Sequence, residues 1–109
     1  MVRNVRAAAM ALLLTAAAAG MPAFAAGDAA NGRAIAVRWC ADCHLVSPDQ
    51  RQALADVPSF QAIVDAAGGE LVWLSAFLAD PHPVMPDMSL TRQEIQNLVA
   101  YFDQLAKRR

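Results

Sequence analysis

The chain has 109 residues, enough for one small domain. It carries 9 basic and 10 acidic side chains, a net charge of −1, and this balance argues against a nucleic-acid partner, which requires a basic surface. The hydrophobic share of 57% is raised by an apolar stretch at the N-terminus.

The N-terminal segment has the order of a secretory signal peptide. Arg3 and Arg6 precede an apolar stretch over residues 7–20, and a small-x-small triplet ends at Ala25. A positive start, an apolar centre and a small-residue cleavage site define such a peptide. An uncleaved membrane anchor is the alternative, but the stretch is near the lower length limit for a span and alanine is weakly hydrophobic. We therefore expect cleavage near Ala25, a periplasmic protein, and no stable membrane insertion afterwards.

The domain organisation that follows is a signal peptide over residues 1–25 and one domain over residues 26–109. Removal of the signal peptide takes two arginines with it, so the mature chain is more acidic than the whole. Domains this short bury little apolar surface and often need a bound or covalent staple.

The first predicted helix covers residues 26–38. Asp28 is a suitable N-cap. Gly32 lies inside the helical pattern, where a glycine often marks the close approach of another backbone. Ile35 and Trp39 lie four positions apart and share a face, so we expect Trp39 to lie in the core.

Residues 45–58 form a predicted loop with a Ser-Pro-Asp turn signal. Ser59 is expected to cap a short helix over residues 60–67, which a Gly-Gly pair closes. A third helix is predicted from about residue 70 to residue 79, and Pro81 stops it.

Residues 81–88 form a predicted loop with three prolines, which fix φ and make the segment stiff. Thr91 and Glu94 have the spacing of a capping box. The last predicted helix, over residues 92–107, has apolar residues at helical spacing. Because no segment has a convincing strand pattern, the sequence predicts an all-α domain of three to four helices.

The most informative stretch is the motif Cys40-Ala41-Asp42-Cys43-His44. It holds both cysteines and one of the two histidines of the chain. Cys-x-x-Cys-His is the attachment pattern of haem c. Two thiols three positions apart can each bond one vinyl group of a porphyrin, and the next residue presents an imidazole to the iron. We therefore expect the helices to surround one haem c bound covalently to Cys40 and Cys43, with His44 as the proximal ligand.

The second axial position of the iron has three candidates, Met85, Met88 and His82, since methionine and histidine are both haem ligands. Met85 is favoured because the stiff loop would present its flexible side chain at a fixed point. With both axial positions filled, no substrate reaches the iron, which favours outer-sphere electron transfer over catalysis. Trp73 is expected either to donate its indole N–H to a haem propionate or to be buried with that N–H on a backbone carbonyl.

Two other classes of protein share parts of the motif. A thioredoxin-like protein also has a tryptophan before its cysteine pair, but it needs a preceding strand and a βαβ frame. A zinc module could use Cys40, Cys43, His44 and His82, but adjacent Cys43 and His44 fit poorly with the usual ligand spacing. The sequence favours haem c over both.

On these residues the chain resembles a small class I cytochrome c of bacterial type. The matching residues are Gly32, the Cys40–His44 motif, Met85-Pro86 and the run Leu98-Val99-Ala100-Tyr101-Phe102. The resemblance implies that Gly32 and Tyr101 mark the crossing of the N- and C-terminal helices. It also implies that Met85 is the distal ligand.

One departure from the family pattern is Ala36. Many members carry an aromatic residue at this position, packed at the helix crossing. The alanine puts that contact in doubt, and Phe102 or Trp39 would have to compensate.

The resemblance implies a periplasmic electron carrier rather than an enzyme, one that exchanges single electrons with redox protein partners. An alternative is the haem c subunit of a periplasmic dehydrogenase complex. A pentacoordinate haem sensor is a further alternative if Met85 is not a ligand.

Overall fold

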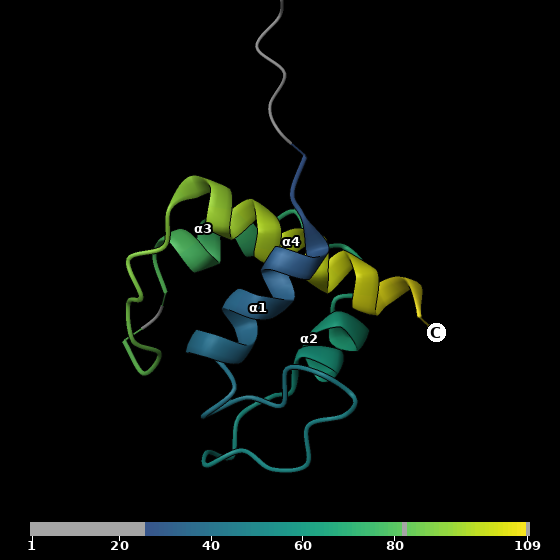
Figure 1. The fold of residues 1–109 in the computed structure, drawn as a ribbon, viewed down its shortest axis with the longest axis vertical. Coiled ribbons are helices and arrows are strands. Elements are labelled where there is room, and N and C mark those ends of the chain that lie inside the picture. The colour runs from purple at the N-terminus through teal and green to yellow at the C-terminus, as the bar shows by residue number, and fades with distance from the viewer. Residues whose placement is uncertain (1–25, 82, 109) are drawn as a thin grey trace, which may run out of the picture.

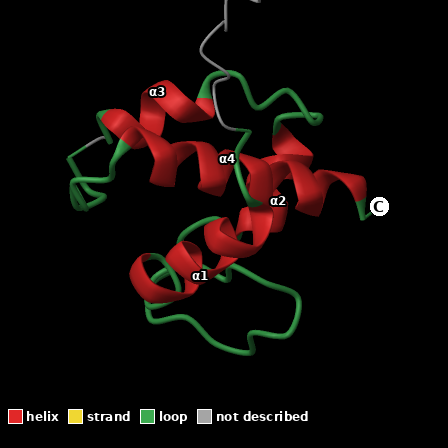
Figure 2. Ribbon diagram, turned by 45° about the horizontal axis from the view of Figure 1, so that its top comes forward, coloured by secondary structure: helices red, strands yellow, loops and turns green. Residues whose placement is uncertain are grey.

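The computed structural model describes residues 26–81 and 83–108. Over these residues the chain forms helices and no strand, as predicted (Figures 1 and 2). The helices are α1 (Ala29–Trp39), α2 (Phe60–Ala66), α3 (Leu74–Ala79) and α4 (Arg92–Lys107). The predicted signal peptide and the candidate ligand His82 lie outside the described residues. Among the helices that are described, none has the length and apolar character needed to cross a membrane.

Helix ends that carry a side-chain cap were predicted best. The Asp28 carboxylate accepts a hydrogen bond from the Asn31 N–H at 3.0 Å, so α1 begins at Ala29, three residues later than predicted. α4 has the predicted bounds, and its capping box is formed by Thr91 and Glu94. Such a cap pairs N–H groups that the helix itself leaves unpaired.

α3 is shorter than predicted because residues 70–73 form a turn ahead of it. Gly68 and Gly69 close α2 with φ values of 60° and 88°, in the left-handed region that glycine adopts without strain. The chain then turns through a hydrogen bond from the Leu74 N–H to the Leu71 carbonyl at 3.0 Å. No side chain caps α3, so its start left no local signal in the sequence.

α1 crosses α4, while α3 lies along the N-terminal half of α4 and α2 toward its C-terminal half (Figures 1 and 2). The predicted role of Gly32 is confirmed, because a Cβ there would overlap the backbone carbonyl of Asn97. Gly27, just before α1, meets the carbonyl of Gln96 in the same way. The two helices therefore touch backbone to backbone.

The core-facing stripe of α1 consists of Gly32, Ala36 and Cys40, each four residues after the last and each buried. The prediction that Trp39 lies in the core is wrong. Its side chain is 48% exposed, and the Arg38 guanidinium lies 4.9 Å from its ring centroid. The reason is helical periodicity, since Cys40 and not Trp39 continues the buried stripe.

The core is closed on α4 by Leu98, Tyr101, Phe102 and Leu105, each at most 2% exposed. Phe102 stacks on Phe60 of α2 with 4.2 Å between ring centroids. Ala36 is fully buried, so its methyl group lies at the helix crossing, where many family members carry an aromatic side chain. Trp39, turned to solvent, does not compensate for it.

Candidate functional site

The two cysteines lie on one continuous turn at the end of α1. Cys40 is the C-cap residue, and its carbonyl accepts hydrogen bonds from the N–H groups of Cys43 (3.2 Å) and His44 (2.8 Å). Both thiols are free, Cys40 buried and Cys43 exposed. The helical end of α1 thus presents two thiols from a single turn.

The electrostatics of the pair differ from those of a redox-active dithiol. Burial, with a smaller contribution from Cys43, raises the pKa of Cys40 to about 11. Reactive Cys-x-x-Cys sites instead lower a thiol pKa and hold a thiolate. The surroundings of Cys40 therefore do not favour the thiolate that a redox-active dithiol site requires.

The imidazole of His44 is held from behind by a backbone carbonyl. Its Nδ1 lies 2.6 Å from the oxygen of Pro58, and because a carbonyl only accepts, Nδ1 carries the proton and donates it. The neutral ring then keeps its lone pair on Nε2, the arrangement found for metal-ligating histidines. The Phe60 ring, 5.7 Å from the imidazole centroid, packs against the same group.

The segment after the motif is tied to the helices around it. Tyr101 of α4 donates its buried hydroxyl to the Val46 carbonyl at 2.6 Å. The Phe60 N–H at the start of α2 donates to the Leu45 carbonyl at 2.9 Å. Two helices remote in sequence therefore hold the two residues that follow His44.

The distal candidates lie in the loop that leads into α4. Met85 is half-buried and packs against the core, and Met88 is half-buried as well. Ser89 has a φ of 53°, and its N–H donates to the Asp87 carboxylate at 2.7 Å, which turns the chain toward α4. In both views this loop hangs on the side of the molecule where α1 ends (Figures 1 and 2).

Trp73 is only partly covered, so the expectation that its side chain is buried is wrong, and donation of its N–H to a haem propionate stays a prediction. It is 43% exposed and meets the Phe77 ring edge-on at 5.9 Å. It borders a largely apolar hollow of about 600 Å³ whose other walls are Pro58, Ala62, Ile63, Ala66 and Ala67. Pro58 thus both borders this hollow and holds His44.

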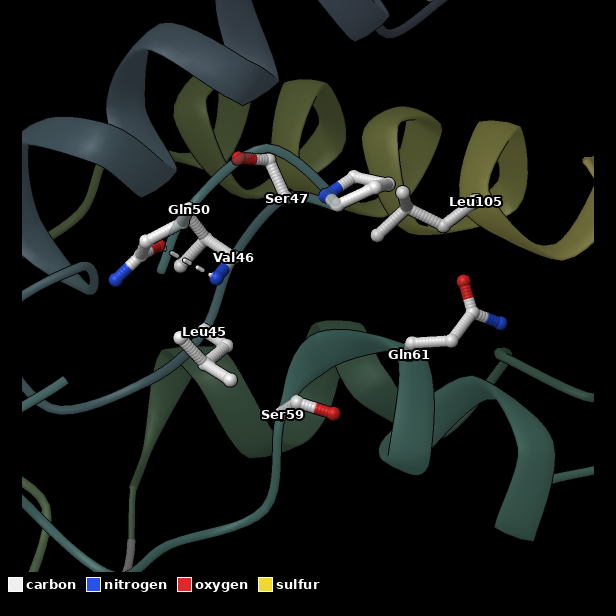
Figure 3. A pocket seen from close by; sticks show the side chains of 8 residues that line it. Leu45, Val46, Ser47, Gln50, Ser59, Gln61 and Leu105 are labelled. Carbon is white, nitrogen blue, oxygen red and sulfur yellow. Dashed lines mark hydrogen bonds between the residues drawn. The ribbon is translucent and has the colours of Figure 1, made fainter. Parts of the chain in front are cut away.

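A smaller hollow of about 320 Å³ lies where the segment after the motif faces the start of α2 and the C-terminal part of α4 (Figure 3). Its walls mix apolar side chains such as Leu105 with the polar Ser59 and Gln61. It contains neither cysteine nor His44.

One curated protein matches the chain over most of its length. Cytochrome c-552 of Bradyrhizobium diazoefficiens is 43% identical over 94 residues, which cover 86% of this chain and 89% of that protein. The chain belongs to the class I monohaem cytochromes c. No family profile matches the chain, and no solved structure does.

A class I cytochrome c carries one covalently bound haem c, so the predicted family and cofactor are confirmed. The residues present fit this group. Two free thiols share one turn, an imidazole has Nε2 available, and an apolar hollow adjoins the residue that holds it. The chain is therefore a cytochrome c that carries electrons.

Membership of the cytochromes c excludes the thioredoxin-like and zinc hypotheses. The described residues before the motif form α1 and no strand, whereas a thioredoxin-like frame needs a strand there.

Four residues that support the site or the helix crossing were not predicted from the sequence: Gly27, Gln50, Pro58 and Asn97. The Gln50 side chain contacts the backbone on both sides of His44. Pro58 acts through its carbonyl, which every residue has, so nothing in the sequence marked it. Asn97 accepts the Asp28 N–H at 2.9 Å, a contact across 69 positions.

Proposed function

We propose that the mature chain is a periplasmic one-electron carrier in which Cys40 and Cys43 bind the haem through thioethers, with His44 as proximal and Met85 as distal ligand. The observation that carries this proposal is the 2.6 Å contact between His44 Nδ1 and the Pro58 carbonyl. It assigns the ring proton to Nδ1 and leaves Nε2 for the iron, in the same motif as two free thiols.

The haem supplies a one-electron couple when bound. The residues of the chain set its properties. Donation from Nδ1 to a carbonyl makes His44 a more basic ligand, whereas a methionine thioether favours ferrous iron and raises the reduction potential. Apolar side chains such as Ile63 would pack against the haem, and an apolar surrounding disfavours the additional charge of the ferric state. Two protein ligands leave no position for a substrate, so electrons pass without bond formation.

Export supports the same function. A signal peptide over residues 1–25, cleaved near Ala25, would deliver the chain to the periplasm, where haem c is attached in bacteria. The stapling of a short domain by a covalent group fits the small core that the described helices build.

The test is expression of the full chain in a bacterium that matures haem c. The intact mass of the purified protein should correspond to residues 26–109 plus one haem, and the pyridine haemochrome spectrum should be that of a porphyrin with two thioethers. A colourless periplasmic product would refute the proposal, and retention of residues 1–25 would refute the export part.

The distal ligand is tested by Met85→Ala with Met88→Ala as the matched control. We expect only the first variant to lose the ferric sulfur-to-iron charge-transfer band and to bind carbon monoxide rapidly in the ferrous form. If the band survives in Met85→Ala, Met85 is not the ligand. Rapid carbon monoxide binding by the wild type would instead indicate a pentacoordinate sensor.

The partners that we propose are redox proteins met by diffusion. The turn and loop around the motif expose the charged groups of Asp42, Arg51 and Asp56, which suits transient, steered encounters. Size exclusion of a native extract, followed by haem absorbance, should show the small monomeric cytochrome. Elution with a large enzyme would favour the dehydrogenase-subunit alternative.

A further inference from the structure

The side chain of Gln50 forms hydrogen bonds with the backbone on both sides of His44 in the sequence. The Gln50 Oε1 accepts a hydrogen bond from the Val46 N–H at 2.9 Å (Figure 3). Its Nε2 lies 2.8 Å from the carbonyl oxygen of Ala41 and 3.0 Å from that of His44. The same nitrogen lies 2.9 Å from the carbonyl of Gln52, which closes the loop. An amide nitrogen has two hydrogens, so the three carbonyls share them.

These contacts lie before, at and after His44 in the sequence. Ala41 precedes the second cysteine, whereas Val46 follows the histidine by two positions. One half-buried side chain therefore fixes the backbone before, at and after His44. The imidazole itself is held at Nδ1 by the Pro58 carbonyl.

We propose that Gln50 is a positioning residue for the proximal ligand. It sets the direction in which the His44 backbone presents the imidazole, and so keeps Nδ1 within 2.6 Å of the Pro58 oxygen. The inference rests on the proposed role of His44. A carboxamide is suited to this role, since it alone among uncharged side chains combines two donors with an acceptor that spans both sides of a turn.

The consequence for the haem follows from the strength of the Nδ1 hydrogen bond. If Gln50 is lost, the turn relaxes and that bond weakens. A histidine that donates less strongly is a poorer electron donor to iron. Ferric iron is then less stabilised, and the reduction potential moves upward.

The test compares Gln50→Met with Gln52→Met in the mature holoprotein. Methionine keeps the volume of glutamine without its hydrogen bonds. The Gln52 side chain is exposed, and the contact with Gln50 uses only its backbone carbonyl. We expect Gln50→Met to raise the midpoint potential and to speed solvent exchange of the His44 Nδ1 proton about fivefold, the factor for one ordinary hydrogen bond. Gln52→Met should match the wild type in both.

A purely structural role predicts a different result. If Gln50→Met lowers the urea midpoint but leaves the potential and the Nδ1 exchange unchanged, the inference is refuted. Should Gln50→Met fail to mature, Gln50→Asn takes its place, because its carboxamide is one methylene shorter and cannot make all four contacts; an unchanged potential and Nδ1 exchange in that variant refute the inference. A wild type that carries haem while both variants behave alike refutes this inference and leaves the proposed function intact. A wild type without haem refutes both.

Discussion

Replacement of Gly32 by alanine tests the backbone contact on which the fold depends. A Cβ at this position would overlap the Asn97 carbonyl and lie 2.9 Å from the Cβ of Tyr101. The first of these groups is backbone and cannot rotate away, so α1 and α4 must separate. Overpacking of an interior costs about 1–3 kcal/mol, and a backbone obstacle favours the upper end. Alanine regains about 1 kcal/mol over glycine within a helix. The expected net loss of stability is about 2 kcal/mol.

Thermal unfolding of the purified holoprotein, followed by far-UV circular dichroism, measures this loss. For a domain of this size the Tm should fall by about 8–16 °C. Gly68→Ala is a comparison for backbone strain rather than a neutral control, because a Cβ there meets no atom within 4 Å and only the φ of 60° opposes it. That backbone strain costs about 1–2 kcal/mol, without any change at the crossing. If Gly32→Ala is as stable as the wild type, the helices do not touch at this point and the packing argument fails.

Thr91→Ala should remove the hydroxyl half of the capping box of α4, while the backbone N–H of residue 91 still donates to Glu94, and lower the free energy of unfolding by about 1 kcal/mol, measured by urea titration. The same variant tests a pH effect. Hydrogen bonds from the Thr91 N–H and hydroxyl lower the pKa of Glu94 below its ordinary value of 4.5. Because the folded pKa is depressed, this contribution is present above pH 4.5 and is lost as the pH falls through the folded pKa. Thr91→Ala should therefore lose less stability than the wild type on acidification below pH 4.5, and an equal loss would contradict this. Tyr101→Phe should leave the Val46 carbonyl without its donor and cost about 1–3 kcal/mol in the same titration. A change of less than a few tenths would show that water replaces the hydroxyl.

The parts of the fold that were predicted correctly are those with local signals. Asp28, Ser59 and Thr91 each cap a helix from the position just before it, and each was predicted. The start of α3 was misplaced because Trp73, its N-cap residue, makes no capping hydrogen bond. Local hydrogen bonds leave a pattern in the sequence, whereas a turn held by backbone groups alone does not.

The site divides in the same way. The two cysteines and His44 carry their chemistry in side chains at fixed spacing, so the motif could be recognised from the sequence. Their supports could not, because Pro58 contributes a backbone carbonyl and Gln50 reaches three backbone carbonyls and one N–H. Those contacts depend on how the loop folds, which no local pattern specifies.

The wrong prediction for Trp39 shows how the fold and the site are joined. The stripe that packs on α4 runs Gly32, Ala36, Cys40, so the first thiol continues the row that forms the helix crossing. On the facing side, α4 meets Gly32 at Asn97 and, one turn later, holds the segment after His44 through Tyr101. The positions of Cys40 and of the segment after His44 therefore both depend on contacts with one stretch of α4. A change that separates the two helices should shift Cys40 against His44, and so disturb the haem site as well as the stability of the domain.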